Sequence, residues 1–148
     1  ESLTQSGELQ NYLDKIRSTS LELFKKGKSD EAIALIQKEI IEKKYAKDND
    51  YSALGDIYLF NKQFVKAEEQ YKKAIDKNSS ELLYQLKLAH VFMFSNKVGQ
   101  AKDIHKLYKD NNVSSSKSWV AQTKFDFEDF EKRGFPTDNF KKILRILE

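Results

Sequence analysis

The sequence predicts an all-α protein, and three observations lead to that class. Apolar residues recur at helical spacing, as in Leu9, Leu13 and Ile16, and no long stretch alternates with a period of two. Five Gly and one Pro among 148 residues are too few turn-forming residues for a many-stranded sandwich or barrel. Short polar stretches interrupt the periodicity and divide the chain into about eight helices. Their expected spans are 6–26, 30–46, 49–60, 63–77, 81–95, 98–110, 116–133 and 138–148.

Turn and capping residues set the boundaries of the first four helices. The first helix ends at the Gly27 turn, and Ser29 is expected to cap the amides of the second helix. Asp30 and Glu31 then lie where the helix dipole favours negative charge. Polar breaks bound the third helix at 47–49 and 61–62.

The later boundaries follow the same chemistry. Ser79 or Ser80 is expected to cap the fifth helix ahead of Glu81. Gly134 can adopt the left-handed conformation that ends the seventh helix, and Pro136 prevents its continuation. The sixth helix lies between polar breaks at 95–97 and 111–116. The last helix places four apolar residues on one face, namely Phe140, Ile143, Leu144 and Leu147.

An internal repeat of 34 residues links these helices into pairs. One unit has apolar, aromatic and small residues at Tyr51, Leu54, Gly55, Tyr58, Ala67, Tyr71 and Ala74. Its small and aromatic positions recur 34 residues later as Ala89, Phe92 and Ala101. An upstream unit fits at a spacing one residue longer, because Ser20 lies 35 residues before Gly55. This pattern resembles the tetratricopeptide repeat, in which an aromatic, Leu-Gly and a second aromatic precede a later Ala and aromatic set.

The resemblance implies a right-handed α-solenoid of antiparallel helix pairs in one domain over residues 1–148. The repeat units would cover about 12–47, 48–81 and 82–112, and a degenerate fourth pair or cap would cover 113–148. In that register Gly55 lies inside a helix, where glycine costs about 1 kcal/mol relative to alanine. We expect close contact across the helix pair to compensate for that cost.

The reactive side chains do not form a recognisable catalytic or cofactor-binding motif. The chain has no Cys, so thiol catalysis and thiolate metal sites are excluded. The two histidines, His90 and His105, fall on different expected helices, and we expect His105 in the seam between helices rather than on a metal. The five glycines are isolated, so the chain lacks a glycine-rich phosphate loop. We therefore expect no enzymatic activity, no metal and no cofactor.

Charge and hydropathy narrow the class of partner. Basic residues number 26 and acidic residues 23, and they are interspersed rather than gathered in a basic block, so we do not expect nucleic-acid binding. No run approaches the ~18 consecutive apolar residues of a membrane span, which favours a soluble chain. Because the sequence begins at Glu1, the compartment stays open: cytoplasmic, or exported if a signal was removed.

The family resemblance also implies a function, because such repeats bind a peptide or protein on the concave face lined by the first helix of each pair. By residue matching, that groove would include Arg17, Asn49, Asp56, Phe60, Leu83, Leu86, Lys87, His90 and Phe94. The positions that hold a terminal carboxylate in chaperone adaptors read Arg17, Leu21, Ala53, Leu83 and Lys87. Most of the polar donors are missing, so we do not expect that recognition mode. The expected function is a protein-binding or peptide-binding scaffold or adaptor without catalytic activity.

Two features keep a second interpretation open. The fifth expected helix is apolar nearly all round, so Leu86 is either covered by the chain's own first or last helix or part of an exposed partner site. Aromatic residues also crowd the C-terminal quarter, at Trp119, Phe125, Phe127, Phe130, Phe135 and Phe140. We expect most of them in the core, with self-association through this end as a further option. The alternative function is therefore a structural, self-associating helical repeat whose groove is filled internally.

Overall fold

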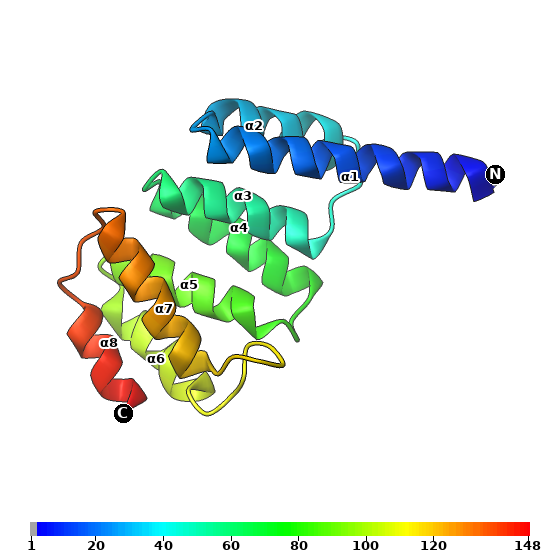
Figure 1. Ribbon diagram of the computed structural model, residues 1–148. Coiled ribbons are helices and arrows are strands. Elements are labelled where there is room, and N and C mark those ends of the chain that lie inside the picture. Colours follow the sequence, from blue (N-terminus) through cyan, green and yellow to red (C-terminus); the bar gives the residue numbers. More distant parts are fainter. Residues whose placement is uncertain (1–2) are drawn as a thin grey trace.

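Helices form the regular secondary structure of residues 3–148, the part of the chain that the computed structural model describes (Figure 1). The elements are α1 (Leu3–Lys25), α2 (Ser29–Ile36), the π-helical turn η1 (Gln37–Ile41) that continues α2, α3 (Asp48–Phe60), α4 (Phe64–Lys77), α5 (Leu82–Phe94), α6 (Val98–Tyr108), α7 (Trp119–Lys132) and α8 (Phe140–Leu147). Over this range there is no β-strand, and an isolated bridge joins Asn112 to Ser118. The predicted all-α class is confirmed, and the expected helices lie within a few residues of the observed ones.

The helix caps differ from the expected ones in two places. Ser29 is the first residue of α2 rather than its cap, and its hydroxyl donates to Asn61 Oδ1 at 3.2 Å. At α5 the Glu81 carboxylate accepts the Leu83 amide at 3.2 Å, so Glu81 is the cap and the two preceding serines are not. A carboxylate immediately before the helix satisfies the exposed amide that a serine would otherwise take.

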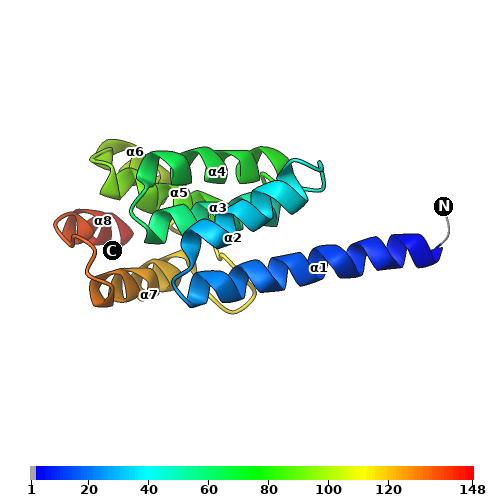
Figure 2. The same cartoon turned by 90° about the horizontal axis from the view of Figure 1, so that it is seen from above.

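Consecutive helices pack in pairs, and the pairs lie side by side (Figure 1). The most extensive contacts join α1 with α2, α3 with α4, and α5 with α6, while contacts of α2 with α3 and of α4 with α5 join neighbouring pairs. After a 90° turn, α1 and α7 lie on one side of the molecule and α4 and α6 on the other (Figure 2). The N-terminal part of α1 projects past α2, and its residues from Gln5 to Tyr12 are exposed.

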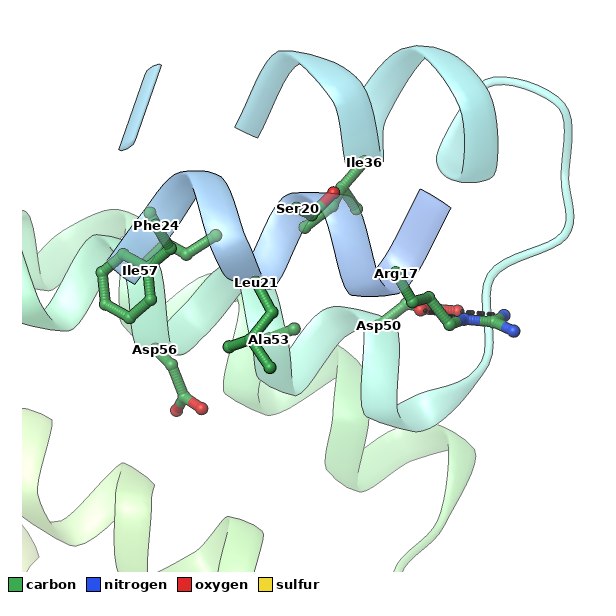
Figure 3. Close-up of a pocket in the computed structure, with 9 residues that line it drawn as sticks. All are labelled: Arg17, Ser20, Leu21, Phe24, Ile36, Asp50, Ala53, Asp56 and Ile57. Atoms are coloured by element: carbon green, nitrogen blue, oxygen red, sulfur yellow. Dashed lines mark hydrogen bonds and ion pairs between the residues drawn. The ribbon is translucent and has the colours of Figure 1, made fainter. Parts of the chain in front are cut away.

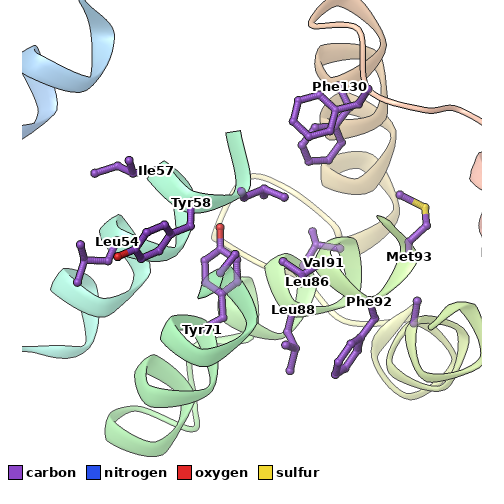
Figure 4. Close-up of a cluster of buried hydrophobic side chains, with 14 of the residues drawn as sticks. Leu54, Ile57, Tyr58, Tyr71, Leu86, Leu88, Val91, Phe92, Met93 and Phe130 are labelled. Atoms are coloured by element: carbon purple, nitrogen blue, oxygen red, sulfur yellow. The ribbon is translucent and has the colours of Figure 1, made fainter. Parts of the chain in front are cut away.

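Gly55 on α3 lies directly against the ring of Tyr71 on α4. A Cβ placed on Gly55 would lie 2.5 Å from Tyr71 Cε1, closer than real Cβ atoms approach a neighbour. The Tyr71 ring is fully buried in the core that also holds Leu54 and Tyr58 (Figure 4). The expected close contact at Gly55 is confirmed, and burial of the aromatic ring offsets the cost of a glycine inside the helix.

The π-helical turn η1 accommodates the extra residue of the first repeat unit. Ile36 lies 35 residues before Tyr71, whereas Ile40 lies 34 residues before Ala74, and all four side chains are buried. The extra residue therefore falls between the two isoleucines, where the helix widens into η1. Because a π-helical turn takes in one residue more than an α-helical turn, both isoleucines keep their inward positions. The helix ends with η1 at Ile41, before the expected end at residue 46, and Lys44 in the turn that follows has a φ of 64°.

The ends of α1, α3 and α5 share one backbone turn. Gly27, Lys62 and Asn96 follow these helices and have φ values of 81°, 60° and 62°. In each turn the next amide donates at 2.8 Å to a carbonyl five residues earlier: Lys28 to Leu23, Gln63 to Tyr58, and Lys97 to Phe92. This bond belongs to the Schellman motif that closes helix ends. The accepting residues occupy one repeat position, so the periodicity of the sequence extends to the backbone.

Aromatic contacts hold the two C-terminal helices. Trp119 on α7 is buried and donates from Nε1 to His105 Nδ1 at 2.9 Å. Phe127 on α7 stacks on Phe140 of α8 with ring centroids 4.2 Å apart, and α8 packs on α6. The expectation that most C-terminal aromatics are core is confirmed, and Phe125 is the exposed exception among the six.

Replacing Gly55 by Ala tests the contact with Tyr71. We expect the free energy of unfolding to fall by about 1–3 kcal/mol, because the added methyl overpacks against a buried ring; Gly55→Leu should not fold. Gly99→Ala on α6 is the matched control, since a Cβ there meets nothing within 4 Å. That control should be neutral or stabilising by up to about 1 kcal/mol. Urea denaturation measures both, and a Gly55→Ala protein as stable as wild type would contradict the packing.

Deleting one residue tests the role of η1. Lys38 is exposed in the π-helical turn, so its removal should return the helix to α geometry and change stability by less than about 1 kcal/mol. Deleting the exposed Lys73 in α4 should cost more than about 4 kcal/mol, because Ala74 and the following residues would leave their buried register. Thermal melts followed by circular dichroism compare the two deletions. Equal losses would show that the π-helical turn does not absorb the extra residue.

Candidate functional site

The side of the molecule formed by α1, α3, α5 and α7 contains two cavities that share Asp56. The apolar cavity, between α1 and α3, has a volume of about 100 Å³ (Figure 3). Its apolar side is lined by Leu21, Phe24, Ile36, Ala53 and Ile57, with Ser20 beside them. The acidic cavity, among α3, α5 and α7, has a volume of about 190 Å³ and is lined by Asp56, Phe60, Lys87, His90, Asp126 and Asp129, together with Phe130.

The apolar cavity follows from a difference between the first two repeat units. Ser20 and Ile36 occupy the positions that Gly55 and Tyr71 have in the next unit. The Tyr71 ring fills the space over Gly55, whereas the shorter Ile36 side chain borders the open cavity together with Ser20. Leu21 at the same cavity is 51% exposed, so this end of the face presents apolar surface to solvent.

A bidentate ion pair closes one end of the apolar cavity (Figure 3). Arg17 on α1 donates from Nε and Nη2 to the two carboxylate oxygens of Asp50 on α3, at 2.8 and 2.9 Å. Hydrogen bonding to Asp50 raises the pKa of Arg17 above its usual value. Asp50 is buried and also accepts the Lys47 amide at 2.9 Å. The Arg17 guanidinium is thus committed within the fold, and this pair fixes α1 relative to α3.

In the acidic cavity, Asp56 is the centre of a hydrogen-bonded group from three helices. Tyr71 on α4 donates its hydroxyl to Asp56 Oδ1 at 2.7 Å, and Lys87 on α5 lies 3.1 Å from Oδ2. Lys87 also donates to Ser52 Oγ at 2.9 Å. Burial, and next the charge of Asp56, raises the pKa of Tyr71 well above its usual value, so the phenol keeps its proton for this bond.

Asp126 on α7 faces the buried His90 on α5. His90 Nε2 lies 2.9 Å from Asp126 Oδ2, and Gln122 donates to Asp126 Oδ1 at 2.8 Å. His90 is 2% exposed, and its Nδ1 has no hydrogen-bond partner within the described part of the chain. Asp126 lies 34 residues after Phe92, so the repeat spacing places a buried aromatic at this position. The chain has an aspartate there instead, and its carboxylate is paired with the imidazole of His90.

His105 lies beneath this site in the seam between α6 and α7, as expected. It is buried, and its Nδ1 accepts the Trp119 indole hydrogen. Burial, and next the neighbouring His90, lowers the pKa of His105 to about 3. The ring is therefore neutral in the folded protein at neutral pH, and Nδ1 is its accepting nitrogen.

The nine residues expected in the groove do not share one environment. Five of them line the two cavities: Arg17, Asp56, Phe60, Lys87 and His90. Asn49 is exposed outside both cavities, and Leu83 and Phe94 are half-buried in the core. Leu86 is fully buried, so it is not part of an exposed partner site.

Sequence reasoning left out the contribution of α7 to this face. Asp126, Asp129 and Phe130 line the acidic cavity, although no groove residue was expected beyond the third unit. The departure of Asp126 from the repeat pattern is the signal that could have pointed to them, since an acidic residue at a core position needs a polar partner.

An aromatic row borders the face at the C-terminal ends of its helices. Phe24 and Phe60 have ring centroids 5.9 Å apart, and Phe60 and Phe130 are 6.1 Å apart. The Arg133 guanidinium lies 4.5 Å from the Phe60 ring centroid and donates from Nε to Asp129 at 2.9 Å. A cation of the chain itself is thus held between an aromatic ring and a carboxylate at the edge of the acidic cavity.

Comparison with protein-family models, curated proteins and solved structures found no match in any of the three. Within residues 3–148, no cluster of three or more His, Asp or Glu side chains is placed to hold a metal ion. In the same range, no helix is long and apolar enough to cross a membrane.

Acidification should destabilise the protein through His105. A histidine pKa is about 6.5 in an unfolded chain and about 3 for His105 in the fold, so the unfolded state takes up a proton first. This contribution to stability is fully present above about pH 6.5 and is lost as the pH falls toward 3. We expect the free energy of unfolding to fall by about 1 kcal/mol between pH 7 and pH 5.5.

The matched variant for this measurement is His105→Gln. Its amide oxygen can still accept the Trp119 indole hydrogen, but the side chain has no proton to gain. Urea unfolding at both pH values should show a smaller loss for the variant than for wild type. The same loss in both proteins would assign the pH dependence to other groups.

Proposed function

We propose that this chain is a tetratricopeptide-like solenoid that binds a segment of another protein along the face of α1, α3, α5 and α7, without chemistry of its own. The observation that carries the proposal is the apolar cavity between α1 and α3, with Leu21 half exposed at its side. Its polar neighbours Arg17 and Asp50 bind each other, and Asp56 is bound by Tyr71 and Lys87. Because these charged groups are already paired, the cavity offers mainly apolar contact and shape.

The repeat periodicity supports the solenoid part of the proposal. The small positions Ser20, Gly55 and Ala89 and the helix-end turns after α1, α3 and α5 follow the same spacing of 35 and then 34 residues. Helix pairs that contact mainly their neighbours in the chain are typical of repeat proteins, and extended binding faces result from their stacking.

A selection experiment tests the binding function. A displayed library of random peptides should yield peptides that bind the protein, and Leu21→Asp should weaken them at least tenfold, because a charge at the cavity opposes an apolar guest. Leu107→Asp on α6 is the control, since Leu107 is also exposed but lies away from both cavities. Its binding should change less than twofold. Failure to select any peptide, or equal loss in both variants, would contradict the proposal.

One observation favours the second candidate, a self-associating structural repeat. Leu86 and His90, both expected in the groove, are buried, and His90 contacts Phe127 and Phe130 of α7. In this interpretation α7 is the internal occupant of the groove. Sedimentation equilibrium decides the matter: a concentration-dependent dimer that Leu21→Asp leaves intact would favour this candidate over peptide binding.

A further inference from the structure

We propose that the occupant of this face is a short basic segment that carries one aliphatic side chain. The aliphatic side chain enters the apolar cavity between α1 and α3, and an Arg of the same segment lies in the acidic cavity among α3, α5 and α7. The inference rests on the proposed function and names the chemistry of the partner.

The two cavities suit a single occupant because they adjoin. Asp56 lines both of them, so a chain that leaves the apolar cavity along the face meets the acidic one next. The Phe24 ring of the first cavity also contacts the Phe60 ring of the second, with centroids 5.9 Å apart, so the two cavities share an aromatic border.

The size and lining of the apolar cavity select an aliphatic side chain. Its volume is about 100 Å³, smaller than the ~150 Å³ of an engineered apolar cavity that admits benzene. A Leu, Ile or Met side chain therefore fits better than a Trp. Leu21, Ala53 and Ile57 supply apolar walls, so filling the cavity removes apolar surface from water on both partners.

The acidic cavity complements a cation. Its lining holds three carboxylates, on Asp56, Asp126 and Asp129, and the ammonium of Lys87. Arg133 at the edge pairs with Asp129, so the carboxylates here outnumber the cations by one, although the whole chain has a formal net charge of +3. The Asp56 and Asp129 side chains are 33% and 40% exposed, so both can accept a further donor. The local excess of negative charge is thus a property of this face and not of the composition.

One further feature at the edge of the acidic cavity points to a planar cation. The chain's own Arg133 already combines stacking over Phe60 with a bond to Asp129. A guanidinium is the side chain that makes both contacts.

An acidic partner is disfavoured because the cations of the face are engaged. Arg17 is held by both oxygens of Asp50, and Lys87 by Ser52 and Asp56. A carboxylate ligand would have to break one of these bonds and lie against the remaining aspartates. Charge therefore selects between partners at this face.

The test uses fluorescein-labelled, terminally blocked nonapeptides that contain one Leu and two Arg at separations of two to five residues. Matched peptides carry Ser for Leu, Gln for Arg, or Glu for Arg, and fluorescence anisotropy measures their binding to the full chain. We expect the Leu/Arg series to include a binder that weakens at least tenfold with Ser for Leu or Glu for Arg. Its affinity should fall with added salt, because charge pairing contributes.

Protein variants locate the two contacts. Asp126→Asn with Asp129→Asn should weaken the Leu/Arg peptide at least tenfold and leave the Gln-for-Arg peptide unchanged. Asp30→Asn with Glu31→Gln removes the same charge from an exposed part of α2 and should change binding less than twofold. Circular dichroism checks that each variant folds. If the double variant does not fold, Asp129→Asn alone replaces it, because Asp129 is the more exposed of the two carboxylates.

The outcomes separate this inference from the proposed function. Glu-for-Arg peptides that bind as tightly as the Arg series, or full binding to the aspartate variants, would overturn the basic segment. Peptides from the display selection that depend on Leu21 but carry no basic residue would also overturn the basic segment, while the proposed binding function would stand. Absence of binding by both the designed series and the display library would overturn both.

Discussion

The contact of the Tyr71 ring with the backbone of Gly55 is the constraint on which the rest of the structure depends. It sets how closely α4 approaches α3, and the same ring carries the hydroxyl that holds Asp56 at 2.7 Å. Asp56 in turn binds Lys87 of α5 and lines both cavities. A packing requirement of the core therefore positions the central charge of the candidate site.

The first repeat unit shows how a periodic fold tolerates an irregular length. An inserted residue in a helix would rotate all later side chains by about 100° and expose the core. Here η1 takes in the extra residue between Ile36 and Ile40, and both remain buried. The same unit carries Ile36 where the next carries Tyr71, and this difference leaves the apolar cavity open. The least regular unit is thus the one with accessible apolar surface.

The sequence predicted those features that depend on spacing and missed those that depend on pairing across distant segments. Helix positions, the close approach at Gly55 and the seam position of His105 follow from periodicity and residue size. The Arg17–Asp50 pair joins residues 33 apart, and the His90–Asp126 pair joins residues 36 apart. Such pairs depend on how helices are placed relative to one another. Periodicity within a helix does not say how two helices are placed relative to each other. From the sequence, Asp126 could be recognised only as a departure from the repeat pattern.

Because α7 packs on part of α5, little apolar surface is exposed on the face formed by α1, α3, α5 and α7. Without α7, Phe94 would be more exposed on this face, and exposed apolar surface favours aggregation as much as specific binding. Phe130 of α7 instead contacts Phe94 with centroids 5.0 Å apart and His90 with centroids 5.2 Å apart. At the two cavities, the exposed large apolar side chain is Leu21, beside a cavity for about one side chain. A contact of that size gives modest affinity by itself, so selectivity must come from the charges next to it. The carboxylates that α7 brings to the acidic cavity supply those charges, which makes α7 both the cover of the core and a wall of the site.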